Sequence, residues 1–171
     1  MKKIYLLFAL VFAPFIGQSQ SVFEVFEDID EVTTVSVSKS AFRLMSKFSG
    51  STSDPETQAY MDMIKELDQL KVFVTEDEKI AGDMQEVANS YIKSSELIEL
   101  MRVKEKGSNV KIYVREGADE DHVRELLMFV TDQNEGNQAV IMSLTGNIDL
   151  NKVALLTEKM NLPAGTNITI E

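Results

Sequence analysis

The sequence contains no cysteine among its 171 residues, and this absence limits both its chemistry and its attachment to membranes. Without thiols the chain forms no disulfide, so the core of an exported form must be stable without covalent crosslinks. A lipoprotein needs a cysteine at its cleavage site, where the thiol is acylated. Lipidation of that kind is therefore excluded, and so is catalysis by a cysteine nucleophile.

Histidine is almost as scarce, because His122 is the only one in the chain. One imidazole cannot supply the several ligands of a histidine-based zinc site. The sequence also lacks the G-x-S-x-G turn of serine hydrolases and the G-x-x-x-x-G-K and G-x-G-x-x-G loops that bind phosphate groups. We therefore predict no catalytic residue, no cofactor-binding residue and no cofactor.

The one long hydrophobic run, at the start of the chain, is too short to span a membrane. Lys2 and Lys3 precede the apolar residues 4–16, and Ser19 supplies a small residue soon after them. A spanning helix needs about 20 apolar residues, whereas this order is typical of a secretory signal peptide. We expect cleavage after Ser19, with an uncleaved anchor as the alternative. The product would be periplasmic or secreted, with no transmembrane span.

Basic residues are few. There are 17 against 28 acidic ones, which gives a net charge of −11, and loss of the two leader lysines would make it −13. Such a surface repels nucleic acids and anionic membranes, so we expect neither as a partner. The charge suits cationic partners or divalent ions, although solubility alone also explains it. Residues 1–19 would be the signal peptide and residues 20–171 a single domain.

The first half of the chain combines helical and strand patterns. Thr75 and Glu78 have the spacing of a capping box, which predicts a helix start there. The predicted elements are a short amphipathic piece at 21–30, strands at 31–39 and 70–74, and helices at 40–48, 55–67 and from 75 onward.

The second half changes to a period of two. Strands are predicted within residues 96–117 and at 123–132 and 138–146, although residues 118–131 also tolerate a helix. A helix capped by Asp149 and a short tail strand should follow. Helices followed by a run of strands indicate an α+β fold. We predict a largely antiparallel sheet with a C-terminal four-strand meander and helices packed mainly on one face.

Asp119 and Asp121 are the candidate metal ligands. They lie in the loop "GADEDH", where hard carboxylate oxygens at this spacing suit Ca²⁺. The alternative is an exposed turn between two strands that its charges keep soluble.

Lys111, Tyr113 and Arg115 are the candidate partner-binding residues. They alternate with apolar residues of the same predicted strand, so they should face outward together. The alternative is an ordinary solvated face.

Several segments resemble those of a family of exported bacterial proteins, domain of unknown function 4252. The similar parts include "VTTVSVSKSAFRLM", "IKELDQLKVFVTED", "ELMRVKEKGSNVKIYVRE" and "IMSLTGNIDLNKVALL", within roughly residues 22–160. The resemblance implies an exported or lipid-anchored protein of Bacteroidota with no catalytic residues to carry over. It also implies a link to envelope stress or sigma-factor signalling.

The leading hypothesis is an exported, non-enzymatic binding or accessory domain of the cell envelope. Its partner would be an envelope protein or a small ligand. A carboxylate- or calcium-dependent hydrolase is one alternative. A structural or oligomerising envelope component is the other.

Overall fold

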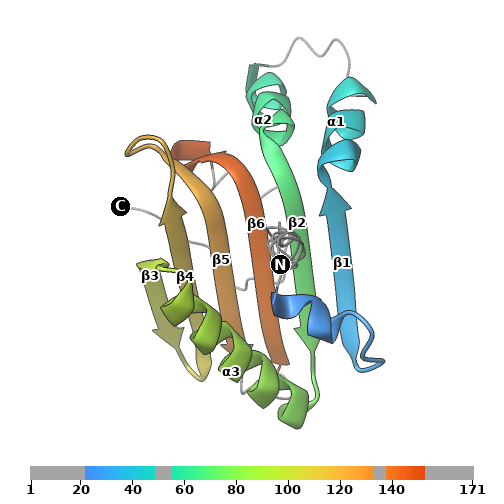
Figure 1. The fold of residues 1–171 in the computed structure, drawn as a ribbon, viewed down its shortest axis with the longest axis vertical. Coiled ribbons are helices and arrows are strands. Elements are labelled where there is room, and N and C mark those ends of the chain that lie inside the picture. Colours follow the sequence, from blue (N-terminus) through green and yellow to red (C-terminus); the bar gives the residue numbers. More distant parts are fainter. Residues whose placement is uncertain (1–21, 49–54, 133–137, 153–171) are drawn as a thin grey trace, which may run out of the picture.

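The computed structural model describes residues 22–48, 55–132 and 138–152. Within them, six strands form one sheet in the order β1-β2-β6-β5-β4-β3, and every neighbouring pair is antiparallel. The last four strands follow one another across the sheet, so the predicted α+β class and C-terminal meander are confirmed (Figure 1). The elements are η1 (Val22–Phe26), β1 (Val32–Ser38), α1 (Lys39–Phe48), α2 (Pro55–Lys65), β2 (Leu67–Thr75), α3 (Glu78–Ser94), β3 (Ile98–Glu105), β4 (Ser108–Glu116), β5 (His122–Asp132) and β6 (Gln138–Asp149).

The early and late parts of the chain meet in the middle of the sheet, where β2 pairs with β6. The chain then passes from β2 to β3 through α3, which crosses the sheet diagonally (Figure 1). β5 and β6 are inner strands, and residues 126–130 and 140–144 are buried throughout. Their apolar runs reflect this burial of both faces, as the sequence predicted.

Neighbouring residues of β2 define the two faces of the sheet, because successive strand side chains point to opposite sides. Phe73 packs in the cluster that contains Met84 of α3, and we call this side the α3 face. Val72 packs in the other cluster, which contains Met63 of α2. The prediction that the helices pack mainly on one face is not confirmed, because the described helices contribute to both core clusters.

The start of α3 differs from the predicted capping box. Asp77 is the N-cap, and its carboxylate accepts hydrogen bonds from the backbone N–H groups two and three residues later, at 2.9 and 3.0 Å. Thr75 is instead the last residue of β2. Its hydroxyl donates to the carbonyl of Glu31 at 2.9 Å and accepts from the N–H of Asp77 at 3.1 Å. The prediction that Thr75 and Glu78 form the cap is therefore wrong.

Two more predicted boundaries move because strand pairing continues past them. Leu67 begins β2, where it pairs with Gly146, and does not end the second helix. Residues 146–148 remain in β6, and Ile148 pairs with Val123. For residues 118–131 the strand interpretation is confirmed, since most of them form β5.

Asp149 caps the backbone as predicted, because its Oδ1 accepts a hydrogen bond from the N–H of Asn151 at 2.9 Å. The remainder of the predicted C-terminal helix, the tail strand and the leader lie outside the described residues. So does the segment 133–137 between β5 and β6.

Candidate functional site

A row of polar side chains crosses the α3 face from the edge strand β1 to β4. The register places one residue from each of five neighbouring strands directly opposite the next, and opposed residues share a face. Strands lie about 4.8 Å apart, so the row is roughly 19 Å long. We call it the polar row, and its members are Ser38, Gln69, Thr145, Glu125 and Arg115.

The polar row borders an apolar surface on the same face. α3 and η1 cross the lower half of the face, where Phe73, Ile141 and Phe129 form a buried apolar row (Figure 1). The C-terminal part of α3 reaches the polar row through Tyr91, and α1 begins directly after Ser38 at the other end of the row. The face therefore changes from apolar beneath the two helices to polar above them.

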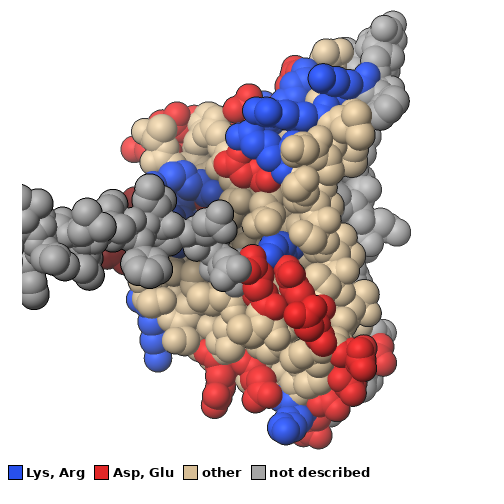
Figure 2. Space-filling model, turned by 45° about the vertical axis from the view of Figure 1, so that its right-hand side comes forward, with Lys and Arg blue, Asp and Glu red and all other residues tan. Residues whose placement is uncertain are grey.

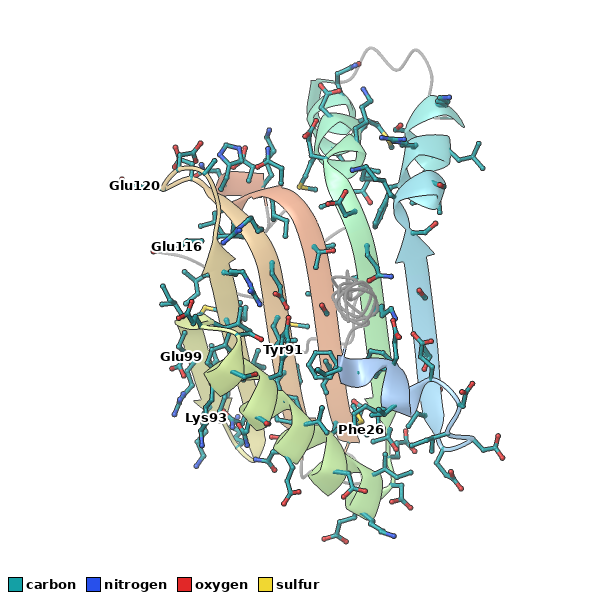
Figure 3. All side chains as sticks on the ribbon, viewed as in Figure 1. Phe26, Tyr91, Lys93, Glu99, Glu116 and Glu120 are labelled. Carbon is teal, nitrogen blue, oxygen red and sulfur yellow. The ribbon has the colours of Figure 1, made fainter. Side chains whose placement is uncertain are left out.

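Glu125 is the buried anion of the polar row, with a side chain only 7% exposed. The hydroxyl of Tyr91 donates to its Oε1 at 2.7 Å, while Arg115 Nε and Nη2 lie 3.2 and 3.0 Å from its Oε2. Burial raises the pKa of Tyr91, and the hydrogen bond to Glu125 raises it further. A buried carboxylate is costly unless it is paired, and here three donors surround it. Tyr91 lies on the side of α3 that faces the middle of the sheet (Figure 3).

Lys71 is a buried cation on the same face, two residues along β2 from Gln69. Its side chain is 5% exposed, and its Nζ lies 2.8 Å from Glu24 Oε1 and 2.7 Å from Glu27 Oε1. Burial lowers the pKa of Lys71, but hydrogen bonds and charge from the two glutamates outweigh it and leave the pKa raised. This triad ties η1 and the turn after it to the centre of the sheet.

A small open pocket of about 140 Å³ adjoins the Arg115 end of the polar row. Arg124 lies at a register shift in β5, and such a bulge redirects a side chain. Its Nε donates to the carbonyl of Glu116 at 2.8 Å. The pocket contains charges of both signs and so suits a polar group that both donates and accepts. Its lining residues are Ser95, Glu96, Ile98, Arg115, Glu116 and Arg124.

Lys111, Tyr113 and Arg115 lie on the α3 face, but they do not form an outward-facing set. Tyr113 is 8% exposed and packs in the core cluster beneath α3, and burial raises its pKa. Arg115 is held by Glu125. Lys111 is half-buried. The predicted shared exposure is therefore wrong, because the helix α3 covers part of this face. Of the three, only Arg115 belongs to the polar row.

Asp119 and Asp121 lie in the loop before β5, where contacts within the chain hold Asp119. The carboxylate of Asp119 lies 2.7 Å from Nδ1 of His122 and also accepts the backbone N–H of Asp121 at 3.1 Å. The bond to His122 lowers the pKa of Asp119, and the same contact raises the pKa of His122. Within the described residues, no group of three or more metal-ligating side chains occurs. The loop is therefore closed by its own contacts, which both use Oδ1 of Asp119.

Lys71, Gln69, Thr145 and Glu125 were not identified from the sequence. A signal was present for two of them, since Lys71 interrupts the apolar segment "LKVFV" and Glu125 precedes "LLMFV". A charge inside an apolar strand is a sign of a buried pair. Their partners could not be read in the same way, because the pairing of β2 with β6 joins distant parts of the chain.

The described chain is an α+β protein with a six-stranded antiparallel sheet and a polar row on its α3 face. It belongs to the family described as a domain of unknown function (DUF4252), whose family model matches residues 26–156. This match confirms the resemblance seen in the sequence. No curated protein matches the chain, and no solved structure matches it. In the part that the structure describes, no helix is both long and apolar enough to cross a membrane.

Proposed function

We propose that this chain is an exported binding module of the cell envelope that captures a polar partner on the polar row. The observation that carries the proposal is the continuous run of polar side chains across five strands, next to an apolar core on the same face.

Stability alone would favour apolar side chains at these positions. Burying a Val or Leu side chain contributes about 1.5–3 kcal/mol, whereas a buried polar group is costly unless it is hydrogen-bonded. Gln69 and Thr145 occupy two inner strands, and both remain half-buried. An amide and a hydroxyl at these positions contribute little to core stability, but they can form hydrogen bonds with a polar partner.

The polar row is also held in a fixed shape. Glu125 and Arg115 lock one end of the row to α3 through Tyr91, and Lys71 locks the neighbouring positions to η1. Side chains with fixed positions lose little freedom on binding, so a partner is bound at a lower entropic cost. A row roughly 19 Å long fits an extended partner, such as a peptide strand or a linear polar ligand.

Export is the second part of the proposal. The basic, apolar and small residues of the leader support cleavage after Ser19 and a periplasmic or secreted location. Release from the leader would leave the described η1 close to the start of the mature chain.

The proposal is tested by capture from native cells. A tagged full-length chain is expressed in its own organism, crosslinked, and purified from the envelope fraction, and the captured proteins are identified by mass spectrometry. The row variant Gln69→Leu/Thr145→Val removes the amide and the hydroxyl with little change in side-chain volume. We expect this variant to lose the partner that the unaltered chain captures reproducibly.

The matched control makes the same two replacements outside the row, as Gln85→Leu/Thr131→Val. It should keep the partner, and circular dichroism should show that both variants remain folded. Equal capture by the row variant and the unaltered chain would refute the polar row as the binding site.

A further inference from the structure

The two edge strands of the sheet differ in how well they resist pairing with another chain. β3 has four charged residues among its eight, and its pairing with β4 contains a register shift between Glu99 and Met101. Charges and bulges on an edge strand discourage association with a further strand. β1 has neither. Its sequence, VTTVSVS, contains no charge and no proline, and its register with β2 is continuous.

β1 therefore presents a regular edge at the end of the sheet. Among the described strands, only β2 pairs with it. At its centre, the Val35 side chain is 49% exposed, although valine is among the residues that are usually buried. Such an uncharged strand with many β-branched residues is a template for another strand.

The charges at the two ends of β1 are opposite. Exposed acidic residues, Glu27, Asp28, Asp30 and Glu31, precede the strand. Exposed basic residues of α1, Lys39, Arg43 and Lys47, follow it. Figure 2 shows this edge of the molecule, with basic side chains gathered at its upper end and acidic ones at its lower end.

We propose that β1 pairs antiparallel with β1 of a second copy of this chain, which would join the two sheets edge to edge. A two-fold axis at Val35 makes the interface self-complementary, as a closed dimer requires. Val35 then opposes Val35 of the second copy, and Thr33 opposes Val37. Glu31 and Lys39 flank the strand, each four residues from Val35. The axis therefore brings Glu31 of one copy near Lys39 of the second copy, and Lys39 near Glu31.

A second copy explains these features better than an unrelated extended peptide. The charge pattern along the edge is its own complement, since an antiparallel copy places each acidic end beside a basic end. Charge complementarity of this kind selects the partner and fixes the register. The interface lies on the edge of the sheet and shares only Ser38 with the polar row, whose other members lie on β2, β6, β5 and β4.

Cysteine crosslinking tests the register directly, because the chain has no cysteine of its own. Directly opposed residues of antiparallel strands have Cα atoms about 4.5–5.5 Å apart, which is within the range for a disulfide. Val35→Cys should therefore form a disulfide-linked dimer under mild oxidation. Thr33→Cys alone should not, whereas an equal mixture of Thr33→Cys and Val37→Cys should form the mixed dimer.

Leu100→Cys is the control on the other edge, where Leu100 of β3 is 51% exposed. It should form no disulfide-linked dimer under the same oxidation. Crosslinking of Leu100→Cys in place of Val35→Cys would overturn the assignment to β1. Crosslinking of Thr33→Cys alone would overturn the register.

Charge exchange tests complementarity without a crosslink. Sedimentation equilibrium of the purified full chain should show a dimer whose dissociation constant rises with salt. Glu31→Lys places like charges together at both ends and should raise that constant about tenfold or more, and the double variant Glu31→Lys/Lys39→Glu should recover most of the loss. Glu86→Lys, on the exposed face of α3, is the matched control and should change it little.

Lys39 also forms an ion pair with Asp68 in its own chain, and the double variant replaces this exposed pair by two like charges. The pair is weak because both side chains are about half exposed, so it should not mask the recovery. A chain that sediments as a monomer at concentrations up to about 100 μM, well above the micromolar range of weak interfaces, would overturn the proposal.

Discussion

The hydroxyl of Tyr91 in α3 donates a hydrogen bond of 2.7 Å to the buried carboxylate of Glu125 in β5. The two residues stand 34 positions apart in the chain, and the bond joins the C-terminal half of α3 to the middle of the sheet. Because Arg115 approaches the other oxygen of Glu125, one carboxylate holds together a helix and two strands. Anything that weakens this carboxylate's contacts should loosen α3 from the face that carries the polar row.

Tyr91→Phe removes one donor from Glu125 and keeps the ring. A buried acceptor that loses its partner costs about 1–3 kcal/mol, and we expect the lower half of that range because Arg115 remains in place. Urea unfolding followed by circular dichroism measures the change in the free energy of unfolding.

Tyr60→Phe is the control, since the pKa of Tyr60 is raised by burial alone and no charge contributes to it. Its free energy of unfolding should change by less than about 0.5 kcal/mol, as is usual away from special contacts. Equal losses in the free energy of unfolding for both variants would show that the hydrogen bond to Glu125 adds no stability of its own.

Removing the two anions around Lys71 should lower the free energy of unfolding more than removing all three charges of the triad. Glu24→Gln/Glu27→Gln leaves a buried cation without a charged partner, and such losses cost about 3–5 kcal/mol. We expect about 3 kcal/mol, because the glutamates are 31% and 35% exposed. The triple variant that adds Lys71→Met should recover most of the loss, since an apolar replacement avoids the unpaired charge.

The Lys71 triad should also respond to alkaline pH. Its folded pKa is raised above the ordinary value of 10.5, so its contribution is complete below that value and disappears as the pH rises through the folded pKa. The Tm of the unaltered chain should therefore fall relative to that of the triple variant as the pH rises above 10.5. A constant difference across that range would contradict the charged triad.

Much of the fold followed from local sequence pattern. The period-two segments gave the meander, because each of its strands pairs with the next strand in the chain. The apolar runs at residues 126–130 and 140–144 identified inner strands, since only side chains covered on both faces can all be apolar. In these regions the information is local, and hydrophobic periodicity is sufficient.

The polar row could not be found in that way. It exists because Gln69 opposes Thr145 and Thr145 opposes Glu125, and these pairings depend on a register between β2 and β6 that no local pattern encodes. The same limit explains Tyr113. Its alternation along β4 was read correctly, but only the path of α3 determines that its side of the sheet is covered. Thr75 was misassigned for a related reason, because it ends β2 opposite Val32 and its hydroxyl donates to the carbonyl of Glu31.

Asp119 and His122 provide a titration that can be assigned without ambiguity, because the chain has one histidine. The hydrogen bond and charge of Asp119 raise the pKa of His122 above 6.5. Asp119→Asn should return it toward 6.5, as measured by the pH dependence of the imidazole NMR signals. Asp121→Asn should have a much smaller effect, since its charge is the weakest of the causes that raise this pKa. An unchanged histidine pKa in Asp119→Asn would show that the contact is absent in solution.

The stabilisation that the Asp119–His122 pair provides should depend on pH and be lost at both the acidic and the alkaline end. The contribution of His122 is present below pH 6.5 and is lost as the pH rises through its raised folded pKa. That of Asp119 is present above pH 3.8 and is lost as the pH falls through its lowered folded pKa. The Tm difference between the unaltered chain and Asp119→Asn should therefore be largest between pH 3.8 and 6.5.

Calcium should leave this loop unchanged. Ca²⁺ takes about six to eight oxygen ligands, whereas the carboxylate of Asp119 already serves His122 and the backbone of Asp121. We expect millimolar Ca²⁺ to change neither the Tm nor the histidine signals. A rise in Tm that disappears in Asp119→Asn/Asp121→Asn would instead establish calcium binding and revive the hydrolase alternative.

Two glycines should respond in opposite directions to alanine. Gly146 has a φ of 143°, and a Cβ there would lie 2.5 Å from the carbonyl oxygen of Glu66, at the junction of α2 and β2. Gly146→Ala should therefore cost about 2 kcal/mol or more, because both the backbone angle and the close contact oppose it. Gly82 lies within α3 with nothing within 4 Å of such a Cβ, so Gly82→Ala should add about 0.5–1 kcal/mol through helix propensity. Urea unfolding gives both values, and a neutral Gly146→Ala would mean that the backbone at Glu66 is not held against β6.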